Sequence, residues 1–380
     1  MIKLLFLIHD LGHGGAEKVL VNLVNNLNRE KFDITVIALF GGGVNEKNLK
    51  DDIRYKAVFS RTIRGNSRLM KLFSPEQLHR YIVKEHYDIE VSYLEGPSAR
   101  IISGCKGKGT KLVSWVHVEQ HSKEIAAQSF RSYEEAKACY ERFDHTVCVS
   151  AAVRDDFQRL FPSINDAEVL YNTNETDAIL EASRQEVTEA CFQKEEFKIC
   201  GVGKIVPTKG FDKLARIHKR LIEAGYQVHT YILGVGSDQE KIEKYIQKEK
   251  LEDTFTFLGY QINPYKYVAK CDLFVCASTA EGFSTAATEA LVVGTPVITT
   301  SVAGMREMLG EDNEYGIITE QSEEALYQGI KNLLNNPEKQ EYYRSMARER
   351  GSYFSKENTV KSVEDMLCML FHEKEKQKWS

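Results

Sequence analysis

The feature that most constrains the fold of this chain is a regular alternation of short apolar segments with amphipathic helical segments. Residues 2–8 form the first apolar segment, and residues 16–27 follow with apolar side chains on one helical face. Strands that alternate with helices form parallel sheets that helices cover on both faces. The sequence therefore predicts an α/β protein with doubly wound sheets. The predicted strands are residues 2–8, 33–39, 88–93, 111–116, 146–150, 197–202, 228–233, 254–258, 273–276 and 296–300.

The alternation is interrupted over residues 172–196, where the chain is polar and rich in Glu, Asn and Thr. A chain of 380 residues has room for two or three domains at about 150 residues each. We therefore expect two domains of similar size, residues 1–175 and residues 176–356. An apolar helical stripe near the end predicts a last helix, about residues 357–380, which we expect to pack back onto the first domain. In doubly wound sheets, ligands bind at the carboxyl ends of the strands.

Composition and charge exclude several classes of protein. A net charge of −5 gives no general attraction to nucleic acid. No apolar run approaches the roughly 20 residues that a membrane-spanning helix needs, and the apolar segment at the N-terminus is too short for a signal peptide. The eight cysteines have neither zinc-finger nor CxxC spacing. We therefore expect reduced thiols in a cytoplasmic protein.

Two glutamates eight positions apart follow the predicted strand 273–276. Glu281 ends a loop, and Gly282 permits a tight backbone turn after it. Good helix formers begin after Ser284, so Glu289 falls in the second helical turn. The loop would thus present an acid, free backbone N–H groups and the positive end of a helix to one space. A sugar that carries hydroxyls and a phosphate suits this mixture.

A second loop follows the predicted strand 197–202 and opens another helix. It carries Gly203, Lys204 and Lys209. Two lysines beside a helix N-terminus suit a diphosphate, and two solvated lysines are the alternative. The loop fits neither GxGxxG nor GxxxxGK[ST], which excludes a dinucleotide fingerprint and a Walker A motif.

Two segments of the first half are each open to two interpretations. The loop after the first strand carries three glycines, the last of them Gly15, which suit close approach to a ligand or a plain turn. His117 ends the predicted strand 111–116, where ligands bind, although a lone His there is more often structural. Its neighbours Glu119 and His121 do not complete an HExxH motif, so no metal site is predicted.

Residues 54–71 hold six basic residues and no acidic one. Arg61, Arg64 and Arg68 belong to this stretch. A basic stretch can dock on anionic lipid, and each residue near the surface contributes about 1 kcal/mol. A solvated surface loop is the alternative, and the sequence alone leaves both open.

Taken together, these motifs resemble the family-4 retaining glycosyltransferases of GT-B fold, and the match covers essentially the whole chain. Its most specific part is the Glu-x7-Glu signature formed by Glu281 and Glu289. The resemblance implies two Rossmann-like domains that face each other across a cleft, the first for the acceptor and the second for the nucleotide sugar. The other matching motifs are Gly-Gly-Ala-Glu at 14–17, His117, Val-Gly-Lys…Lys-Gly-Phe at 202–211, Leu-Gly-Val-Gly at 233–236 and Phe-Leu-Gly-Tyr at 257–260.

The resemblance also implies roles for individual residues. Glu281, Lys209 and His117 would be the catalytic residues, with Glu281 at the hydroxyls of the donor sugar and His117 near sugar and acceptor. Glu289 would accept hydrogen bonds from the ribose hydroxyls. The remaining donor-binding residues would be Gly15, Gly203 and Lys204 at the diphosphate, Gly234, Tyr260 and Gln261 at the nucleobase, and Gly282, Phe283 and Ser284 at the sugar.

The implied reaction moves a sugar, with retention and without a metal or cofactor, from a nucleotide-diphosphate sugar to a saccharide or lipid-linked saccharide. We expect the donor to be UDP-linked and the product to be a bacterial surface polysaccharide such as a capsule. Such an enzyme would be cytoplasmic, or peripheral on the cytoplasmic face of the membrane.

The chain departs from the family pattern at Lys204, at Ser284, where many members have Gly, and at Asn172-Thr173. Lys204 replaces the arginine common in the family, which keeps the charge but loses the bidentate fork. Asn172-Thr173 replaces the Asn-Gly of many members.

A sugar-nucleotide epimerase of the same fold and a non-catalytic subunit are the alternative functions. Release of nucleoside diphosphate that depends on an acceptor discriminates among the three.

Overall fold

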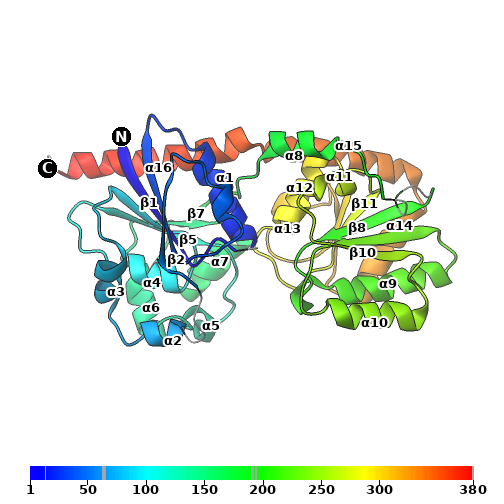
Figure 1. Ribbon diagram of the computed structural model, residues 1–380, viewed down its shortest axis with the longest axis horizontal. Coiled ribbons are helices and arrows are strands. Elements are labelled where there is room, and N and C mark those ends of the chain that lie inside the picture. The colour runs from blue at the N-terminus through cyan, green and yellow to red at the C-terminus, as the bar shows by residue number, and fades with distance from the viewer. Residues whose placement is uncertain (13, 62–65, 190–191, 193–194, 379–380) are drawn as a thin grey trace. The chain divides into compact units, whose positions relative to one another are not determined.

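The structure is a computed structural model that describes residues 1–12, 14–61, 66–189, 192 and 195–378, with side chains omitted at 66–67 and 374–378 (Figure 1). It divides into two compact units. Unit 1 comprises Met1–Asn174 together with Glu357–Ser380, and unit 2 comprises Glu175–Lys356. Each unit is built around its own parallel sheet.

Within the described residues, the sheet of unit 1 has seven parallel strands in the order β3-β2-β1-β4-β5-β6-β7. β1 is a central strand, because Leu4 lies opposite Ile34 on one side and Ile89 on the other. Its residues other than Lys3 are buried on both faces of the sheet, as a largely apolar run predicts. The strands are β1 (Ile2–Ile8), β2 (Phe32–Phe40), β3 (Arg54–Phe59), β4 (Ile89–Ser92), β5 (Lys111–Val116), β6 (His145–Cys148) and β7 (Glu168–Val169).

Helices connect the strands of unit 1 and pack on the sheet. A core cluster joins Leu78 and Ile101 of two helices to Leu5 and Ile37 of the central strands. The last helix belongs to this unit, because Glu364 accepts a hydrogen bond of 2.7 Å from the backbone N–H of Asn28. The described helices are α1 (Gly15–Asn26), η1 (Glu46–Asn48), α2 (Asn66–Met70), α3 (Pro75–Ile82), α4 (Pro97–Ile102), α5 (Lys123–Ala126), α6 (Tyr133–Tyr140), α7 (Ala151–Leu160) and α16 (Lys356–Lys378).

The sheet of unit 2 has six parallel strands in the part of the chain that the structure describes, in the order β10-β9-β8-β11-β12-β13. The order reverses between β8 and β11, which pair side by side although two strands separate them in the sequence. Ligands bind at such a switch point in doubly wound sheets. The strands are β8 (Phe197–Val202), β9 (Val228–Leu233), β10 (Phe255–Gly259), β11 (Leu273–Cys276), β12 (Val297–Thr300) and β13 (Ile317–Thr319).

Helices cover both faces of this sheet (Figure 1). Leu214, Ile242 and Ile330 come from three helices and pack with Ile199 and Val275 of the strands in one buried cluster. The helices of unit 2 within the described residues are α8 (Thr176–Ser183), η3 (Pro207–Lys209), α9 (Phe211–Glu223), α10 (Gln239–Glu249), α11 (Tyr265–Val268), α12 (Thr285–Val293), α13 (Met305–Leu309), α14 (Glu323–Leu334) and α15 (Pro337–Tyr353).

The ten predicted strands are all present, and the structure adds three that the sequence analysis missed. β3, β7 and β13 are each at an edge of the described sheets and are not fully buried. An edge strand needs no continuous apolar run, since one side of it faces solvent. In β3 the basic residues Arg54 and Lys56 hid the strand, and Arg54 pairs with Asp33 of β2 at 3.1 Å.

Candidate functional site

Two loops of unit 2 meet at the carboxyl edge of its sheet because β8 and β11 are neighbours. The backbone N–H of Thr279 donates to the carbonyl of Thr208 at 2.8 Å and ties the loops together. Gly210 makes this approach feasible, since its φ is +66° and an added Cβ would lie 2.1 Å from the carbonyl oxygen of Ala277. Gly210 also precedes α9, so Lys209 is held at the start of that helix.

Lys209 and Glu281 form an ion pair across these two loops. The Nζ of Lys209 lies 2.6 Å from Oε1 of Glu281, whose side chain is only 9% exposed. The hydroxyl of Ser278 donates to the same Oε1 at 2.7 Å. Among the described residues, Oε2 of Glu281 has no hydrogen-bond or ion-pair partner. The pair therefore keeps one carboxylate oxygen and ammonium hydrogens for a ligand.

The same carboxylate lies beside a buried thiol. Sγ of Cys276 is 3.8 Å from Oε1 of Glu281 and 3.5 Å from the hydroxyl of Ser278. Burial raises the pKa of Cys276, and the charge of Glu281 raises it further. Cys276 is therefore a protonated thiol that can donate weakly to Glu281. A small cavity at this place is lined by Lys209, Ser278, Glu281 and Ser284, among others.

The predicted helix after Gly282 is α12, and its N-terminus faces this loop. The hydroxyl of Ser284 caps the helix by accepting the N–H of Ala287 at 3.4 Å. The backbone N–H groups of Gly282 and Ser284 donate to no other described residue. Phe283 is buried between them and packs edge-on against Phe354. Free N–H groups at a helix N-terminus form an anion-binding position.

Glu289 lies in the second turn of α12, as predicted, and is buried. The hydroxyl of Tyr265, on α11, donates to Oε1 of Glu289 at 3.3 Å. The two glutamates of the signature thus have different hydrogen-bond partners. Glu281 faces a cation and a hydroxyl, whereas Glu289 has a phenol as its partner.

The remaining predicted donor residues of unit 2 lie on the loops after β8, β9 and β10. Gly203 and Gly234 are in close contact, because a Cβ on Gly234 would lie 1.9 Å from the carbonyl oxygen of Gly203. Lys204 is exposed and forms no ion pair with any described residue. Tyr260 is exposed, and the side-chain amide of Gln261 donates to the carbonyl of Leu258 at 2.6 Å. Loop residues from three adjacent strands therefore follow one edge of the sheet.

The predicted site residues of unit 1 lie at the carboxyl edge of its own sheet. His117 follows β5, is buried, and packs against Tyr93 with 4.9 Å between ring centroids and an interplanar angle of 58°. Burial lowers the pKa of His117 to about 3, so its imidazole is neutral near pH 7. Its Nε2 is buried without a hydrogen-bond partner among the described residues. A neutral imidazole with an unpaired nitrogen suits hydrogen bonding to a hydroxyl better than general-base catalysis.

Glu95, which the sequence analysis missed, follows the adjacent strand β4. Its carboxylate accepts the backbone N–H of His117 at 3.0 Å, and burial raises its pKa. After β1, His9 pairs with Asp10 at 2.7 Å, and this hydrogen bond lowers the pKa of Asp10. Gly15 is exposed at the start of α1.

The predicted basic docking residues are only partly described. Arg61 is exposed directly after β3, and Arg68 lies on α2. Arg64 lies outside the described residues. Of the helices within the described ranges, none is both long and apolar enough to cross a membrane.

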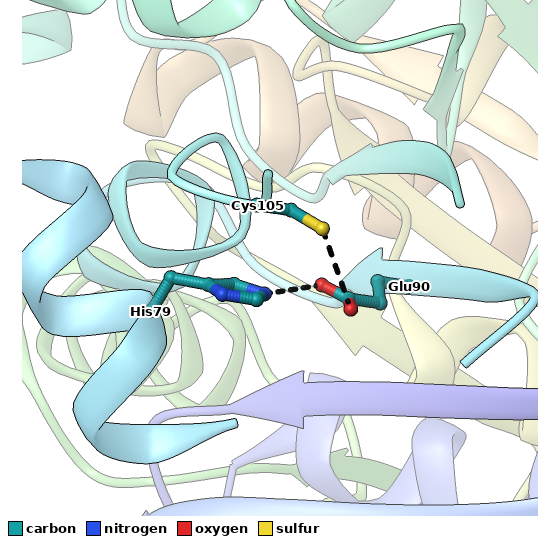
Figure 2. Close-up of side chains that lie close together, drawn as sticks. All are labelled: His79, Glu90 and Cys105. Atoms are coloured by element: carbon teal, nitrogen blue, oxygen red, sulfur yellow. Dashed lines mark hydrogen bonds and ion pairs between the residues drawn. The ribbon is translucent and has the colours of Figure 1, made fainter. Parts of the chain in front are cut away.

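The structure brings together three residues of types that bind metals, which the sequence did not predict to be in contact. They are His79, Glu90 and Cys105 (Figure 2). Nε2 of His79 lies 2.7 Å from Oε2 of Glu90, and Sγ of Cys105 lies 3.6 Å from Oε1. Burial alone would lower the pKa of His79, but hydrogen bonds and charge from Cys105 and Glu90 outweigh it and raise that pKa to about 9. The arrangement is thus a buried imidazolium–carboxylate pair. It lies near the amino end of β4, opposite the edge that carries His117.

The site residues that the sequence analysis missed share one property. Each of them forms a hydrogen bond to a predicted site residue but lies in no sequence motif. They are Ser278, Cys276 and Tyr265. Ser278 lies in the same loop as Glu281 after β11, but a single Ser in a loop gives no pattern.

Two protein-family models match the chain. Residues 13–177 match the model described as Glycosyltransferase Family 4, and residues 184–350 match the model described as Glycosyl transferases group 1. The two matches follow each other along the chain and together span most of both units.

Curated relatives include a glycosyltransferase of Campylobacter jejuni named N-acetylgalactosamine-N,N'-diacetylbacillosaminyl-diphospho-undecaprenol 4-alpha-N-acetylgalactosaminyltransferase. It is 28% identical over 97% of this chain and 100% of its own length. A lipopolysaccharide core biosynthesis glycosyltransferase of Rhizobium meliloti is 21% identical over 87% of this chain and 88% of its own.

Solved structures with the same fold include HepE of Anabaena in complex with UDP, with a TM-score of 0.76, 18% identity and coverage of 97% of this chain and 100% of that one. Sucrose-phosphate synthase of Thermosynechococcus elongatus has a TM-score of 0.80 at 18% identity, covering 98% of this chain and 100% of that chain. These likenesses establish the GT-B fold, and each of the two units is built on a Rossmann-like sheet. The family matches and the site together identify the chain as a glycosyltransferase of the group 1, family-4 type.

Proposed function

We propose that unit 2 binds a nucleotide-diphosphate sugar and that the enzyme transfers the sugar, with retention, to a lipid-linked saccharide in surface-polysaccharide synthesis. The observation that carries the proposal is the Lys209–Glu281 ion pair, 2.6 Å long, beside the N-terminus of α12. It offers a cation and free N–H groups for a diphosphate and a carboxylate oxygen for a sugar hydroxyl. The similarity to the Campylobacter enzyme supports a lipid-linked acceptor.

We propose UDP as the nucleotide carrier of the donor. The Anabaena protein with the same fold was solved with UDP, which supports this choice. Glu289 would accept hydrogen bonds from the ribose hydroxyls, and the loops at Gly234, Tyr260 and Gln261 would surround the base. Gly203, Lys204 and Lys209 would lie along the diphosphate.

During transfer, the bond between the anomeric carbon and the diphosphate oxygen breaks while the acceptor hydroxyl forms its bond on the same face. Negative charge then grows on the leaving diphosphate, and Lys209 with the N–H groups of α12 stabilises it. The acceptor proton passes to the leaving phosphate oxygen. Glu281, held by Lys209 and Ser278, orients the sugar through its unpaired oxygen. The "4-alpha" in the name of the Campylobacter relative supports retention if the donor is α-linked.

Because these cations and dipoles lie where the charge develops, we propose that transfer needs no metal ion. A chelator should therefore leave turnover unchanged in the purified enzyme.

For unit 1 we propose acceptor binding, in which neutral His117 offers Nε2 to a substrate hydroxyl and Gly15 leaves room for the donor phosphates. We propose that the enzyme is cytoplasmic, or peripheral on the cytoplasmic face of the membrane. The acceptor would lie at that face.

The donor assignment is tested with a panel of nucleotide sugars that differ in base and in sugar, scored by thermal shift and by slow hydrolysis. We expect UDP-linked sugars to raise the melting temperature and one of them to be hydrolysed slowly. Equal shifts with every base, or no shift at all, would contradict a specific nucleotide-sugar site. Formation of an epimerised nucleotide sugar would favour the epimerase alternative, which the comparisons do not support.

Replacing Glu289 by Ala is expected to weaken UDP binding about 10- to 100-fold, because the ribose loses one or two charge-assisted hydrogen bonds. Titration of UDP by calorimetry measures this. Glu243, on α10, provides a control, and Glu243→Ala should bind UDP as the wild type does. An unchanged affinity in Glu289→Ala would refute the ribose role.

A further inference from the structure

An exposed apolar patch spans the end of α2 and the turn that follows it in unit 1. Leu69, Leu72 and Phe73 are 56%, 73% and 50% exposed. They alternate with the basic residues Arg68 and Lys71, and no acidic residue occurs from position 54 to position 75. Large apolar side chains are seldom exposed together on a protein surface without a partner. We call residues 68–73 the apolar-basic patch.

The backbone of the patch is fixed by two arginines from other elements. Arg100 of α4 is buried, pairs with Glu135, and donates to the carbonyls of Met70 at 2.9 Å and Phe73 at 2.8 Å. Arg131 donates to the carbonyl of Lys71 at 2.6 Å and to that of Leu72 at 3.2 Å. Four consecutive carbonyls, from Met70 to Phe73, are therefore satisfied from the protein side.

Turn hydrogen bonds within the patch fix it further. The N–H of Leu72 donates to the carbonyl of Leu69 at 3.1 Å, and the N–H of Phe73 donates to that of Met70 at 3.2 Å. Inserting the side chains into an apolar medium would leave these carbonyls paired, which avoids the main cost of burying a backbone. The segment is built as a turn whose backbone faces the protein and whose apolar side chains are exposed.

We propose that the apolar-basic patch docks unit 1 on an anionic lipid bilayer, with Leu69, Leu72 and Phe73 in the interface and Arg68 and Lys71 among the headgroups. Apolar area combined with electrostatic attraction is what interfacial membrane binding requires. A second copy of the chain is a poorer occupant, because two copies of a patch without acids would repel each other. The docking proposal rests on the proposed function, because a lipid-linked acceptor would lie at such a membrane surface.

Co-sedimentation of the full chain with vesicles tests this proposal without a donor or an acceptor. We expect binding to phosphatidylcholine vesicles that contain about one-third phosphatidylglycerol and much weaker binding to pure phosphatidylcholine. The double variant Leu72→Ser/Phe73→Ser should bind at least about tenfold more weakly at both low and high salt. The variant Arg68→Ser/Lys71→Ser should lose most of its binding at low salt and with it the salt dependence.

Met369→Ser is the matched control, because Met369 is 48% exposed on α16 of the same unit. It should bind vesicles as the wild type does. A melting curve of each variant reports whether it is folded, and its thermal shift with UDP reports whether the donor site binds UDP. Loss of the donor site is thereby distinguished from loss of vesicle binding. Absent vesicle binding, or binding that Leu72→Ser/Phe73→Ser leaves intact, overturns the proposal. A wild-type dimer in gel filtration that this variant dissociates overturns it in favour of a second copy.

Discussion

Replacing Lys209 by Ala is expected to reduce turnover about 100- to 1,000-fold while the chain stays folded. Loss of one preorganised charge at the point where transition-state charge develops costs about this much in other enzymes. Glu281→Ala should lose a similar factor, because the ion pair and the unpaired carboxylate oxygen disappear together. Steady-state release of UDP in the presence of acceptor measures both.

The two substitutions should also be strongly non-additive, since each removes the partner of the other. Lys209→Arg keeps the charge and should retain part of the activity. Lys219→Ala serves as the control, because Lys219 lies on α9 and pairs with Glu249 at 2.6 Å without belonging to the site. Lys219→Ala should be as active as the wild type. Near-normal transfer by Lys209→Ala would remove the site assignment.

Replacing Glu90 by Gln is expected to lower the stability of unit 1 by about 3–5 kcal/mol, since the buried ring of His79 must then either lose its proton or stay charged without its counter-charge. Fluorescence of Trp115, which is buried in β5, can follow unfolding of this unit by urea. The only other tryptophan is Trp379, so the measurement uses a Trp379→Phe background. Glu168→Gln is the control, because Glu168 pairs with His145 at 3.0 Å but is 42% exposed, and should cost less than about 1 kcal/mol.

The same pair predicts how stability depends on pH. The pKa of His79 is raised to about 9 from an ordinary 6.5. Its stabilisation is therefore complete below about pH 6.5 and is lost as the pH rises through about 9. The free energy of unfolding of unit 1 should fall over this window by roughly 2–4 kcal/mol. His79→Gln should remove this slope, and a slope unchanged in that variant would contradict the charged pair.

The position of the candidate donor site could be predicted because parallel strands bring their carboxyl ends to one edge. Lys209 and Glu281 are 72 residues apart, yet each follows a strand at the switch point, and the structure joins them. The part that Ser278 plays at Glu281 could not be predicted, because a single Ser in a loop gives no pattern. The predicted roles of Gly234, Tyr260 and Gln261 remain proposals, since they depend on a bound nucleotide.

Other features were hidden for identifiable physical reasons. His79, Glu90 and Cys105 come from α3, β4 and the segment after α4, so no local spacing announces their contact. The imidazole of His117 is neutral because the ring is buried, with Tyr93 packed against it, and periodicity does not reveal that burial. β3 was missed because its basic residues suit an edge strand, whereas continuous apolar runs are typical of strands that are buried in the sheet.

We propose that the site of unit 2 holds a donor sugar that leaves only by transfer to an acceptor. Proton NMR of a UDP-linked sugar from the panel, incubated with enzyme and a synthetic diphospho-undecaprenol-linked saccharide, follows the anomeric signals directly. We expect UDP and a single α-linked product to appear together, at least about 100-fold faster with the acceptor than without it, and Lys209→Ala to slow both about 100- to 1,000-fold. Equal consumption of the donor without an acceptor, or a β-linked or epimerised product, would contradict it.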